Sequence, residues 1–343
     1  MSDQALQISE AQESDAFAWN AFVEAHEHGS TFHRWEWRDV YAGVYGHACP
    51  YLIARRGGAI VGVLPLVRVK SLVFGHYLVS LPYVSYGGPL SDAEGEAALT
   101  DAAANLAHGA KLVELRSRIA ISTTLTPVNR KITVLLDLVP GDYDATFKRF
   151  DSKLRSQVRR GEKEGIVVKF GREHAAAYHQ VFVEHMRDLG SPAHGLRFFE
   201  RLADSLGDRA WIGVAYLGDT PVAAGFAIEN GREVEISWAS ALRRYQKISP
   251  NMALYGAFIR RACERGFDVF NFGRCTEGSG THKFKKQWGS QDEPLQWYFG
   301  AATGLLDIPT SESPGYRSAV RVWQALPLAI ARVLGSHLIA GIP

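Results

Sequence analysis

A run of nine residues, 281–289, combines four basic or imidazole side chains with two aromatic rings and no acid. Phe284 and Trp288 are four residues apart, the spacing that places two side chains on one face of a helix. We expect these rings to anchor the segment and to hold Lys285 in a fixed position. A fixed ammonium can stabilise the oxyanion that forms when an amine attacks an acyl carbonyl. Lys285 and Phe284 are therefore candidate catalytic residues, and a solvated basic helix end is the alternative.

Two further cations, Arg274 and Lys283, are candidates for binding the anionic parts of a substrate. Arg274 directly follows the strand predicted over 269–272, and the carboxyl ends of strands are where α/β folds place ligand-binding groups. Ser279 is not surrounded by a GxSxG motif, and the twelve histidines form no HExxH motif. The sequence therefore favours neither a serine hydrolase nor a metal site.

A helix with well-marked ends is predicted over 251–265, after the strand predicted over 234–240. Ser249 is the expected N-cap of this helix. The free N–H groups at such a helix end can bind a phosphate or a developing oxyanion. We therefore name Ser249, Asn251 and the strand residue Trp238 as candidate substrate-binding residues, with an ordinary capped core helix as the alternative.

Segment 148–163 carries seven basic residues against two acidic ones. Such a helix can bind the phosphates of a tRNA or of a nucleotide-linked acceptor, and a solvated basic face is the equal alternative. The candidate nucleic-acid-binding residues are Lys153, Arg155, Arg159 and Arg160. In the first half of the chain, Tyr86 ends a predicted strand, and its hydroxyl is a candidate for orienting an acceptor, with turn chemistry as the alternative.

The composition limits the class of protein. The chain has 343 residues, 46% of them apolar and 22% charged, with a formal net charge of +2. This is a globular composition, and the small net charge gives no global reason to bind nucleic acid. Three cysteines without CxxC spacing favour a reducing compartment, and the N-terminus has no apolar signal-peptide core. We expect a cytoplasmic protein, because no apolar run approaches the roughly 20 residues that span a bilayer.

The order of predicted elements indicates a mixed α/β (α+β) protein with two domains. Helices are predicted over 14–26, 35–45, 92–107, 143–164, 173–189, 196–206 and 251–265. Strands are predicted over 6–9, 51–54, 59–70, 77–86, 111–116, 132–138, 166–170, 210–217, 222–228, 234–240 and 269–272. Residues 57–63 resemble 218–224 at a fixed offset, and both hairpins follow two helices. The chain therefore reads as two copies of one mixed-sheet domain, 1–140 and 141–312, with a helical segment over 313–343.

Three blocks of the sequence resemble the FemABX-type peptidyl and aminoacyl transferases of the GNAT acyltransferase superfamily. The first is Phe-His-Arg-Trp-Glu-Trp-Arg-Asp-Val-Tyr at 32–41, with Leu-Pro-Leu at 64–66 and Tyr-Gly-Gly-Pro at 86–89. The second is Leu-Arg-Ser-Gln-Val-Arg-Arg-Gly-Glu-Lys-Glu-Gly at 154–165. The third and most specific is Asn-Phe-Gly-Arg at 271–274 followed by residues 280–289. The chain is especially similar to the FemAB-like branch found with exosortase (PEP-CTERM) and exopolysaccharide systems.

The resemblance implies two tandem GNAT-like domains and an acyltransferase activity. In such proteins an aminoacyl group passes from tRNA to an amine on a cell-envelope precursor, and the Phe-Lys pair of the transfer centre maps to Phe284 and Lys285. Segment 243–251 lacks the glycines of a coenzyme A loop, so aminoacyl-tRNA is the expected donor ahead of acyl-CoA, with no tightly bound cofactor. Tyr41 stands where the peptidoglycan transferases carry a lysine, which argues against a muropeptide acceptor. The acceptor is then an amine-bearing small molecule or another envelope precursor.

The C-terminal segment 313–343 contains no acidic residue and several arginines among apolar residues. A basic amphipathic helix of this kind can lie on an anionic membrane surface, which would make the protein membrane-peripheral. Docking of the helix on the protein's own core is the alternative. A different class of function follows from the first possibility: a non-catalytic GNAT-like scaffold that binds a membrane or a polysaccharide-export partner.

Overall fold

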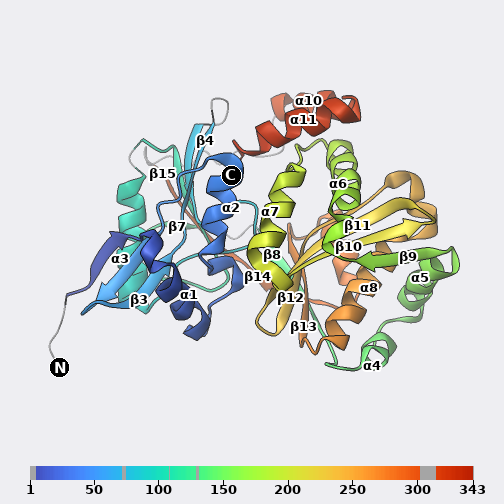
Figure 1. The fold of residues 1–343 in the computed structure, drawn as a ribbon, viewed down its shortest axis with the longest axis horizontal. Coiled ribbons are helices and arrows are strands. Elements are labelled where there is room, and N and C mark those ends of the chain that lie inside the picture. Colours follow the sequence, from blue (N-terminus) through green and yellow to red (C-terminus); the bar gives the residue numbers. More distant parts are fainter. Residues whose placement is uncertain (1–4, 72–74, 108, 129–130, 302–313, 343) are drawn as a thin grey trace. The chain divides into compact units, whose positions relative to one another are not determined.

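A computed structural model describes residues 5–71, 75–107, 109–128, 131–301 and 314–342 (Figure 1). The chain divides into two compact units. The first unit comprises Met1–Ile132, Pro294–Ile308 and Ala340–Pro343, and the second comprises Thr133–Glu293 and Pro309–Ile339. The expected domains were 1–140, 141–312 and 313–343. The division differs because the strand Ile132–Asp137 joins the sheet of the second unit, whereas the strand Gln296–Ala301 joins a sheet of the first.

The first unit contains two sheets and three α-helices among its described residues. An antiparallel three-stranded sheet has the order β1-β2-β3, and a five-stranded sheet has the order β4-β5-β6-β15-β7. The strands are β1 (Gln7–Glu10), β2 (Leu52–Arg56), β3 (Ala59–Leu64), β4 (Val67–Ser71), β5 (Gly75–Val79), β6 (Leu112–Ser117), β7 (Thr126–Pro127) and β15 (Gln296–Ala301). The helices are α1 (Ala16–Ala25), α2 (Glu36–Tyr45) and α3 (Ala93–Leu106).

The second unit is built on one seven-stranded sheet of order β14-β8-β13-β12-β11-β10-β9. Its strands are β8 (Ile132–Asp137), β9 (Ile166–Phe170), β10 (Ala210–Leu217), β11 (Thr220–Asn230), β12 (Glu233–Ala241), β13 (Val269–Cys275) and β14 (Gln291–Pro294). Its helices are α4 (Tyr143–Lys148), α5 (Ser152–Lys163), α6 (Ala175–Leu189), α7 (Leu196–Leu206), α8 (Pro250–Glu264), α9 (Gly280–Lys286), α10 (Pro314–Gln324) and α11 (Leu328–Ile339). Figure 1 shows α10 and α11 side by side next to α6.

The internal repeat is visible in the strand register. Hairpin β2–β3 has a bulge between Ala54 and Arg55, and hairpin β10–β11 has one between Ala215 and Tyr216. The two bulges are separated by 215 − 54 = 161 residues, which is the offset of the sequence repeat. In both units two helices precede the hairpin, and a strand from before these helices pairs with its first strand. A bulge conserved in position between the halves supports two copies of one structural unit.

Four predicted elements were wrong in extent. The strand predicted over 59–70 is two strands, because Pro65 lacks the N–H that a continuous ladder needs. The helix predicted over 143–164 is α4 and α5, because the Asp151 carboxylate accepts from the Leu154 N–H at 2.7 Å and starts a new helix. The C-terminal helix is α10 and α11, which are separated at Pro327.

The strand predicted over 77–86 ends at Val79. Leu81 and Tyr83 have φ values of +51° and +74°, which an extended strand does not accommodate. After this point the chain remains buried. Tyr86 is 2% exposed, and the Arg118 guanidinium lies 5.6 Å from the centre of the Tyr86 ring. The Tyr41 hydroxyl is also buried and donates to the Pro82 carbonyl at 2.5 Å. Tyr41 thus has a structural partner within the first unit.

Candidate functional site

The centre of the candidate site is a separation between the parallel strands β12 and β13. The two strands pair over only three residues, from Glu233 opposite Val269 to Glu235 opposite Asn271. Strand β12 then carries an extra residue, Ser237, because Phe226 of β11 pairs with Trp238 while Ala227 pairs with Ile236. Both strands continue, to Ala241 and Cys275, without further pairing to each other among the residues described. The backbone groups on the two facing edges are therefore left for other partners.

Gly273 forms a bend in β13 just beyond the last residue pair with β12. Its φ is +72°, and a Cβ at this position would lie 2.9 Å from the Ile236 carbonyl oxygen. An L-residue would meet both an unfavourable backbone conformation and a backbone clash, so this bend requires glycine. The Gly273 N–H donates to the Asn271 Oδ1 at 2.8 Å, which holds the bend from the preceding residues.

The side chain of Lys285 occupies the acceptors that this bend creates. Its ammonium donates to the carbonyl oxygens of Gly273 at 2.6 Å and Arg274 at 3.0 Å. The residue is only 3% exposed. Burial lowers the pKa of Lys285 from 10.5 to about 8; the nearby Arg274 lowers it further, while Cys275 and Glu235 act in the opposite direction. An ammonium has three N–H groups, so one remains beyond the two backbone contacts.

Helix α9 presents Lys285 because an aromatic cluster anchors it, as the spacing of Phe284 and Trp288 predicted. Trp288 is 1% exposed and lies 6.1 Å, centre to centre, from Tyr255 of α8. Phe284 meets the same Tyr255 edge-on at 5.1 Å, and Tyr255 stacks on Phe272 of β13 at 5.5 Å. At the start of the helix, the Ser279 hydroxyl accepts from the His282 N–H at 3.2 Å. The position of Lys285 is thus fixed by the ring contacts of its neighbours Phe284 and Trp288 and by the cap at the start of α9.

A buried polar network lies behind the separation of the strands. Asn271 is fully buried and donates through Nδ2 to Glu233 at 2.8 Å and to Glu235 at 3.4 Å. The Thr133 hydroxyl of β8 donates to the Asn271 Oδ1 at 2.5 Å. Glu235 also accepts from the Ser237 hydroxyl at 3.1 Å. Two carboxylates are therefore held on one buried face of β12, beside the residues that bend β13.

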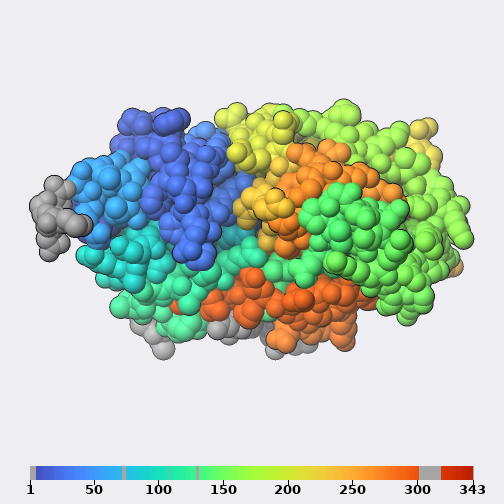
Figure 2. All heavy atoms as spheres, turned by 90° about the horizontal axis from the view of Figure 1, so that it is seen from below, coloured from blue at the N-terminus to red at the C-terminus, as the bar shows by residue number. Residues whose placement is uncertain are grey.

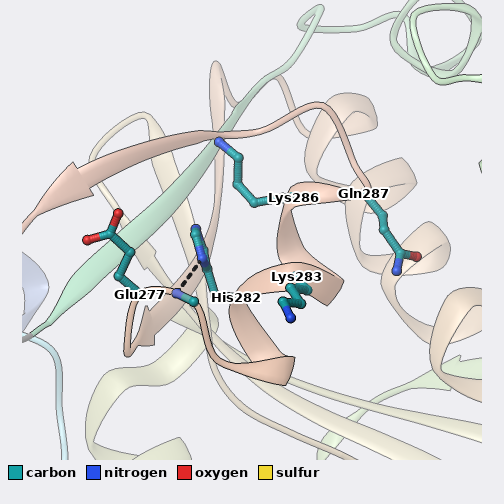
Figure 3. Close-up of a pocket in the computed structure, with 6 residues that line it drawn as sticks. Glu277, His282, Lys283, Lys286 and Gln287 are labelled. Atoms are coloured by element: carbon teal, nitrogen blue, oxygen red, sulfur yellow. Dashed lines mark hydrogen bonds between the residues drawn. The ribbon is translucent and has the colours of Figure 1, made fainter.

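A shallow pocket of about 480 Å³ lies over α9 and is lined by Glu277, Gly278, His282, Lys283, Lys286 and Gln287 (Figure 3). His282 accepts from the Gly278 N–H at 2.9 Å and contacts Asp292 through Nε2 at 3.0 Å. Lys286 is held by the Ser290 carbonyl at 2.6 Å, whereas Lys283 is exposed and extends in a different direction from α9 in Figure 3. Lys283 and Lys285, which the sequence joined in one run, thus lie on different sides of the helix.

A second group surrounds Arg274 and Trp238. His194, in the loop between α6 and α7, is 5% exposed, and its ring centre is 6.2 Å from Trp238 and 4.4 Å from Phe198. Burial lowers the pKa of His194 to about 3, and the positive charge of Arg274 contributes to the shift. A neutral imidazole is therefore expected beside these residues at physiological pH.

Ser249 is the N-cap residue of α8, as predicted, but it caps the helix without its side chain. Ser249 adopts a left-handed conformation with φ +57°, and its side chain makes no capping hydrogen bond. Its carbonyl instead accepts from the N–H groups of Met252 and Ala253 at 3.1 and 3.2 Å. Asn251 lies in the first turn and is half-buried. The preceding residues, Arg243–Ile248, form a short 3₁₀ helix in place of a glycine loop.

Helix α5 carries the predicted basic residues at the surface beside α8, as Figure 2 shows in green and orange. Lys153 and Arg159 are exposed, and Arg159 lies 5.2 Å from the Phe147 ring centre. Arg155 donates to the Lys148 carbonyl at 3.0 Å, and Arg160 lies 3.7 Å from Glu164. The remaining predicted site residue, Tyr86, belongs to the first unit.

Sequence reasoning missed Glu233, Glu235 and His194. Two acids at alternate positions of an otherwise apolar strand were a usable signal, since alternate residues share one face and charged residues are rarely buried without partners. His194 gave no comparable signal, because its neighbours come from distant segments.

Comparison with known proteins agrees with this geometry. Residues 148–286 match the family described as acetyltransferase (GNAT) domain. This match includes α5, β12, α8, β13 and the Lys285 segment. No curated protein sequence gives a significant match.

Solved structures with the same fold extend the comparison to both units. FemX is similar over 85% of this chain and 97% of its own, with a TM-score of 0.64 and 14% identity. L-PGS from Bacillus licheniformis is similar over 95% and 98%, with a TM-score of 0.54 and 14% identity. A tandem GNAT protein from the clavulanic acid biosynthesis pathway is similar over 89% and 100%, with a TM-score of 0.53 and 11% identity. The predicted mixed α/β fold with a tandem GNAT-like architecture is confirmed.

The described residues contain no group of three or more His, Cys, Asp or Glu side chains that could bind a metal ion. None of the helices within the described ranges is long and apolar enough to cross a membrane.

Proposed function

We propose that this protein is an N-acyltransferase that moves an aminoacyl or acyl group from a carrier to an amine acceptor. The observation that carries the proposal is the opening between β12 and β13, bent at Gly273 and closed from behind by Lys285. Such an opening offers backbone N–H and C=O groups that no neighbouring strand uses, and these can align an extended substrate. The match to an acetyltransferase domain supports this assignment.

The reaction requires a neutral amine, an activated carbonyl and a donor for the oxyanion. The amine nitrogen forms a bond to the carbonyl carbon, the bond from that carbon to the carrier oxygen or sulfur breaks, and the amine proton passes to the leaving atom or to solvent. We propose that the remaining N–H of Lys285, with backbone N–H groups at the β12 edge, stabilises the tetrahedral oxyanion. Phe284 keeps Lys285 in place through its contact with Tyr255.

The other predicted residues have proposed roles in binding. Arg274 and Lys283 are proposed to bind anionic parts of donor or acceptor, since Arg274 is the penultimate residue of β13 and Lys283 lines the open pocket. Ser249 and Asn251, at the start of α8, are proposed to contact the donor. Trp238, which is half-buried on β12, is proposed to contact the acceptor. Tyr86 is likewise proposed to contact an acceptor, and this proposal concerns the first unit, to which Tyr86 belongs.

Aminoacyl-tRNA is our preferred donor, with acyl-CoA as the alternative. The short 3₁₀ helix before α8 carries cations but no glycine, so close approach of its backbone to a pyrophosphate is hindered. The basic surface of α5, with Lys153, Arg159 and Arg160, suits a phosphate backbone. Acyl-CoA is supported by the family match, because the matched family is described as an acetyltransferase. Either donor is a co-substrate and not a tightly bound cofactor.

We further propose an amine-bearing small molecule or envelope precursor as acceptor, with a place in envelope or exopolysaccharide synthesis at the cytoplasmic side of the membrane. A non-catalytic scaffold is the second candidate function. It is favoured by the exposed apolar side chains on α10 and α11, which are Val322, Ile330, Val333, Leu334 and Leu338. A scaffold needs an exposed apolar surface to bind its partner, whether or not the opening between β12 and β13 is used.

Thermal unfolding with acetyl-CoA, longer acyl-CoAs, and charged or uncharged tRNA tests these proposals. A ligand at 100 times its Kd stabilises the folded state by roughly 2.7 kcal/mol, which is visible as a rise in Tm. A shift with charged tRNA alone would support aminoacyl transfer. A shift with acyl-CoA alone would replace our preferred donor. No shift with either class, together with no transfer of labelled acyl group to an amine panel, would contradict the enzyme proposal and favour the scaffold.

A further inference from the structure

Helix α11 is apolar on two opposite faces, and only one of them is covered. Its inner face is made of small residues: Ala331 is 2% exposed and Gly335 is buried. A Cβ on Gly335 would lie 3.0 Å from the backbone nitrogen of Ala193, so glycine permits this close seat. A helix that is apolar on all sides normally buries all of them. The uncovered face of α11 therefore needs its own explanation.

That uncovered face carries large side chains. Eight large apolar residues are strongly exposed among the described residues of the whole chain, and five of them lie on α10 and α11. These five, which we call the outer surface, are Val322 (66% exposed), Ile330 (45%), Val333 (57%), Leu334 (44%) and Leu338 (40%). The four on α11 follow a spacing of three, one and four residues and so share one helix face. A sixth exposed residue, Leu189, ends α6, on which these helices rest.

The charge of this segment is of one sign. Residues 313–343 contain no aspartate or glutamate. Arg321 is exposed next to Val322, whereas Arg332, two residues from Ile330 and from Leu334, lies on the other side of α11. An exposed apolar surface with positive charge at its margin fits a lipid bilayer, which has a hydrocarbon interior and anionic headgroups. We propose that the outer surface of α10 and α11 binds an anionic phospholipid bilayer, with the five apolar side chains inserted and Arg321 at the headgroups.

The same helices rest on the loop that reaches the candidate site. Val320 of α10 closes over Gly190, where an added Cβ would lie 2.4 Å from its side chain, and Ser336 of α11 lies against Gly195. His194, between these contacts, is the residue that meets Trp238 and lies near Arg274. Binding to a bilayer would thus bring the membrane to one side of this loop and leave the opening of β12 and β13 on the other. If the proposed acyl transfer is correct, acceptors at the membrane surface come within its reach.

Co-sedimentation of the full chain with vesicles tests this proposal. Neutral phosphatidylcholine vesicles are compared with vesicles containing phosphatidylglycerol, at low and at high salt. We expect binding to the anionic vesicles that weakens as salt screens Arg321. The double variant Val333→Glu, Leu334→Glu should reduce binding by at least about tenfold, because two inserted apolar groups are replaced by charges of the wrong sign. Arg321→Gln should reduce it by about fivefold, with the salt dependence weakened.

Val167→Glu is the matched control, since Val167 on β9 is 56% exposed and lies in the same unit. All these positions are at the surface, and circular dichroism with Tm checks that each variant is folded. Equal binding to neutral and anionic vesicles, or unchanged binding by the double variant, would overturn the proposal. So would absence of vesicle binding combined with self-association that Val333→Glu, Leu334→Glu abolishes, because the outer surface would then be an interface between copies. None of these readouts depends on transferase activity.

Discussion

The ammonium of Lys285 donates to the carbonyl oxygen of Gly273 at 2.6 Å, at the bend of β13 just beyond its last residue pair with β12. In a continuous parallel ladder, a backbone N–H of the neighbouring strand would donate to such a carbonyl. Here a buried side chain from α9 takes that role, so the strands remain apart without leaving a buried carbonyl unsatisfied. Lys285 is thus both a structural partner of the bend and a cation beside the opening.

Removal of the Lys285 ammonium should reduce turnover strongly. We expect Lys285→Met to lower kcat by roughly 10²–10³-fold, because a preorganised donor to an oxyanion contributes about 3–4 kcal/mol. The KM for the donor should change by only a few fold, since the side chain is 3% exposed and does not face the pocket over α9. Lys169→Met, an exposed lysine on β9, is the control. Wild-type turnover in Lys285→Met would remove Lys285 from the mechanism.

The stability of the protein should depend on Lys285 in alkaline solution. Its pKa is lowered from 10.5 to about 8, so between these pH values the unfolded chain binds the proton more tightly than the folded one. The free energy of unfolding of the wild type, relative to Lys285→Met, should therefore rise by about 3 kcal/mol from pH 8 to pH 10.5. Urea unfolding of both proteins across this range measures the difference. A constant difference would mean that Lys285 titrates normally.

Gly273 should be intolerant of any side chain, and Gly278 provides a matched control. Both have positive φ, +72° and +74°, but a Cβ on Gly278 meets nothing within 4 Å, whereas one on Gly273 meets the Ile236 carbonyl at 2.9 Å. Gly278→Ala should cost about 1 kcal/mol, the cost of the left-handed conformation alone. Gly273→Ala should cost at least about 2 kcal/mol more and reduce turnover. Equal effects of the two substitutions on chemical unfolding would contradict the close contact of Gly273 with the Ile236 carbonyl.

Acid should destabilise the second unit through His194. Burial, Arg274 and His179 lower its pKa from 6.5 to about 3, so the unfolded chain takes up a proton that the folded chain excludes. This contribution is present above pH 6.5 and is lost as pH falls toward 3, amounting to about 2 kcal/mol by pH 5. His194→Phe keeps a ring beside Phe198 and removes the titration. Its free energy of unfolding should fall less than that of the wild type between pH 7 and pH 5, and a parallel fall would exclude His194 as a cause.

Local patterns were sufficient for most of the fold. Apolar spacing located α1, α2, α3, α7 and α8 to within one or two residues at most ends, because one face of each helix is buried. Alternation and turn glycines located hairpins β2–β3 and β10–β11, and with them the tandem repeat. The failures occur where a single polar contact or backbone conformation ends an element. Asp151 starts a new helix, and Tyr83 takes a positive φ that no propensity indicates.

The candidate site divides in the same way. The sequence by itself determined that Phe284 and Trp288 would anchor α9, since this follows from spacing along one segment. It placed Arg274 just after a strand over 269–272, whereas β13 continues to Cys275 and includes Arg274. Only the tertiary structure decided where the Lys285 ammonium points, because its acceptors are created by a bend twelve residues away. Tertiary contacts also decided that Asn271 would join Thr133, which is 138 residues distant in the chain. Such contacts depend on how strands from separate segments meet. A buried polar group must find a hydrogen-bond partner, but the sequence does not show which residue this partner will be.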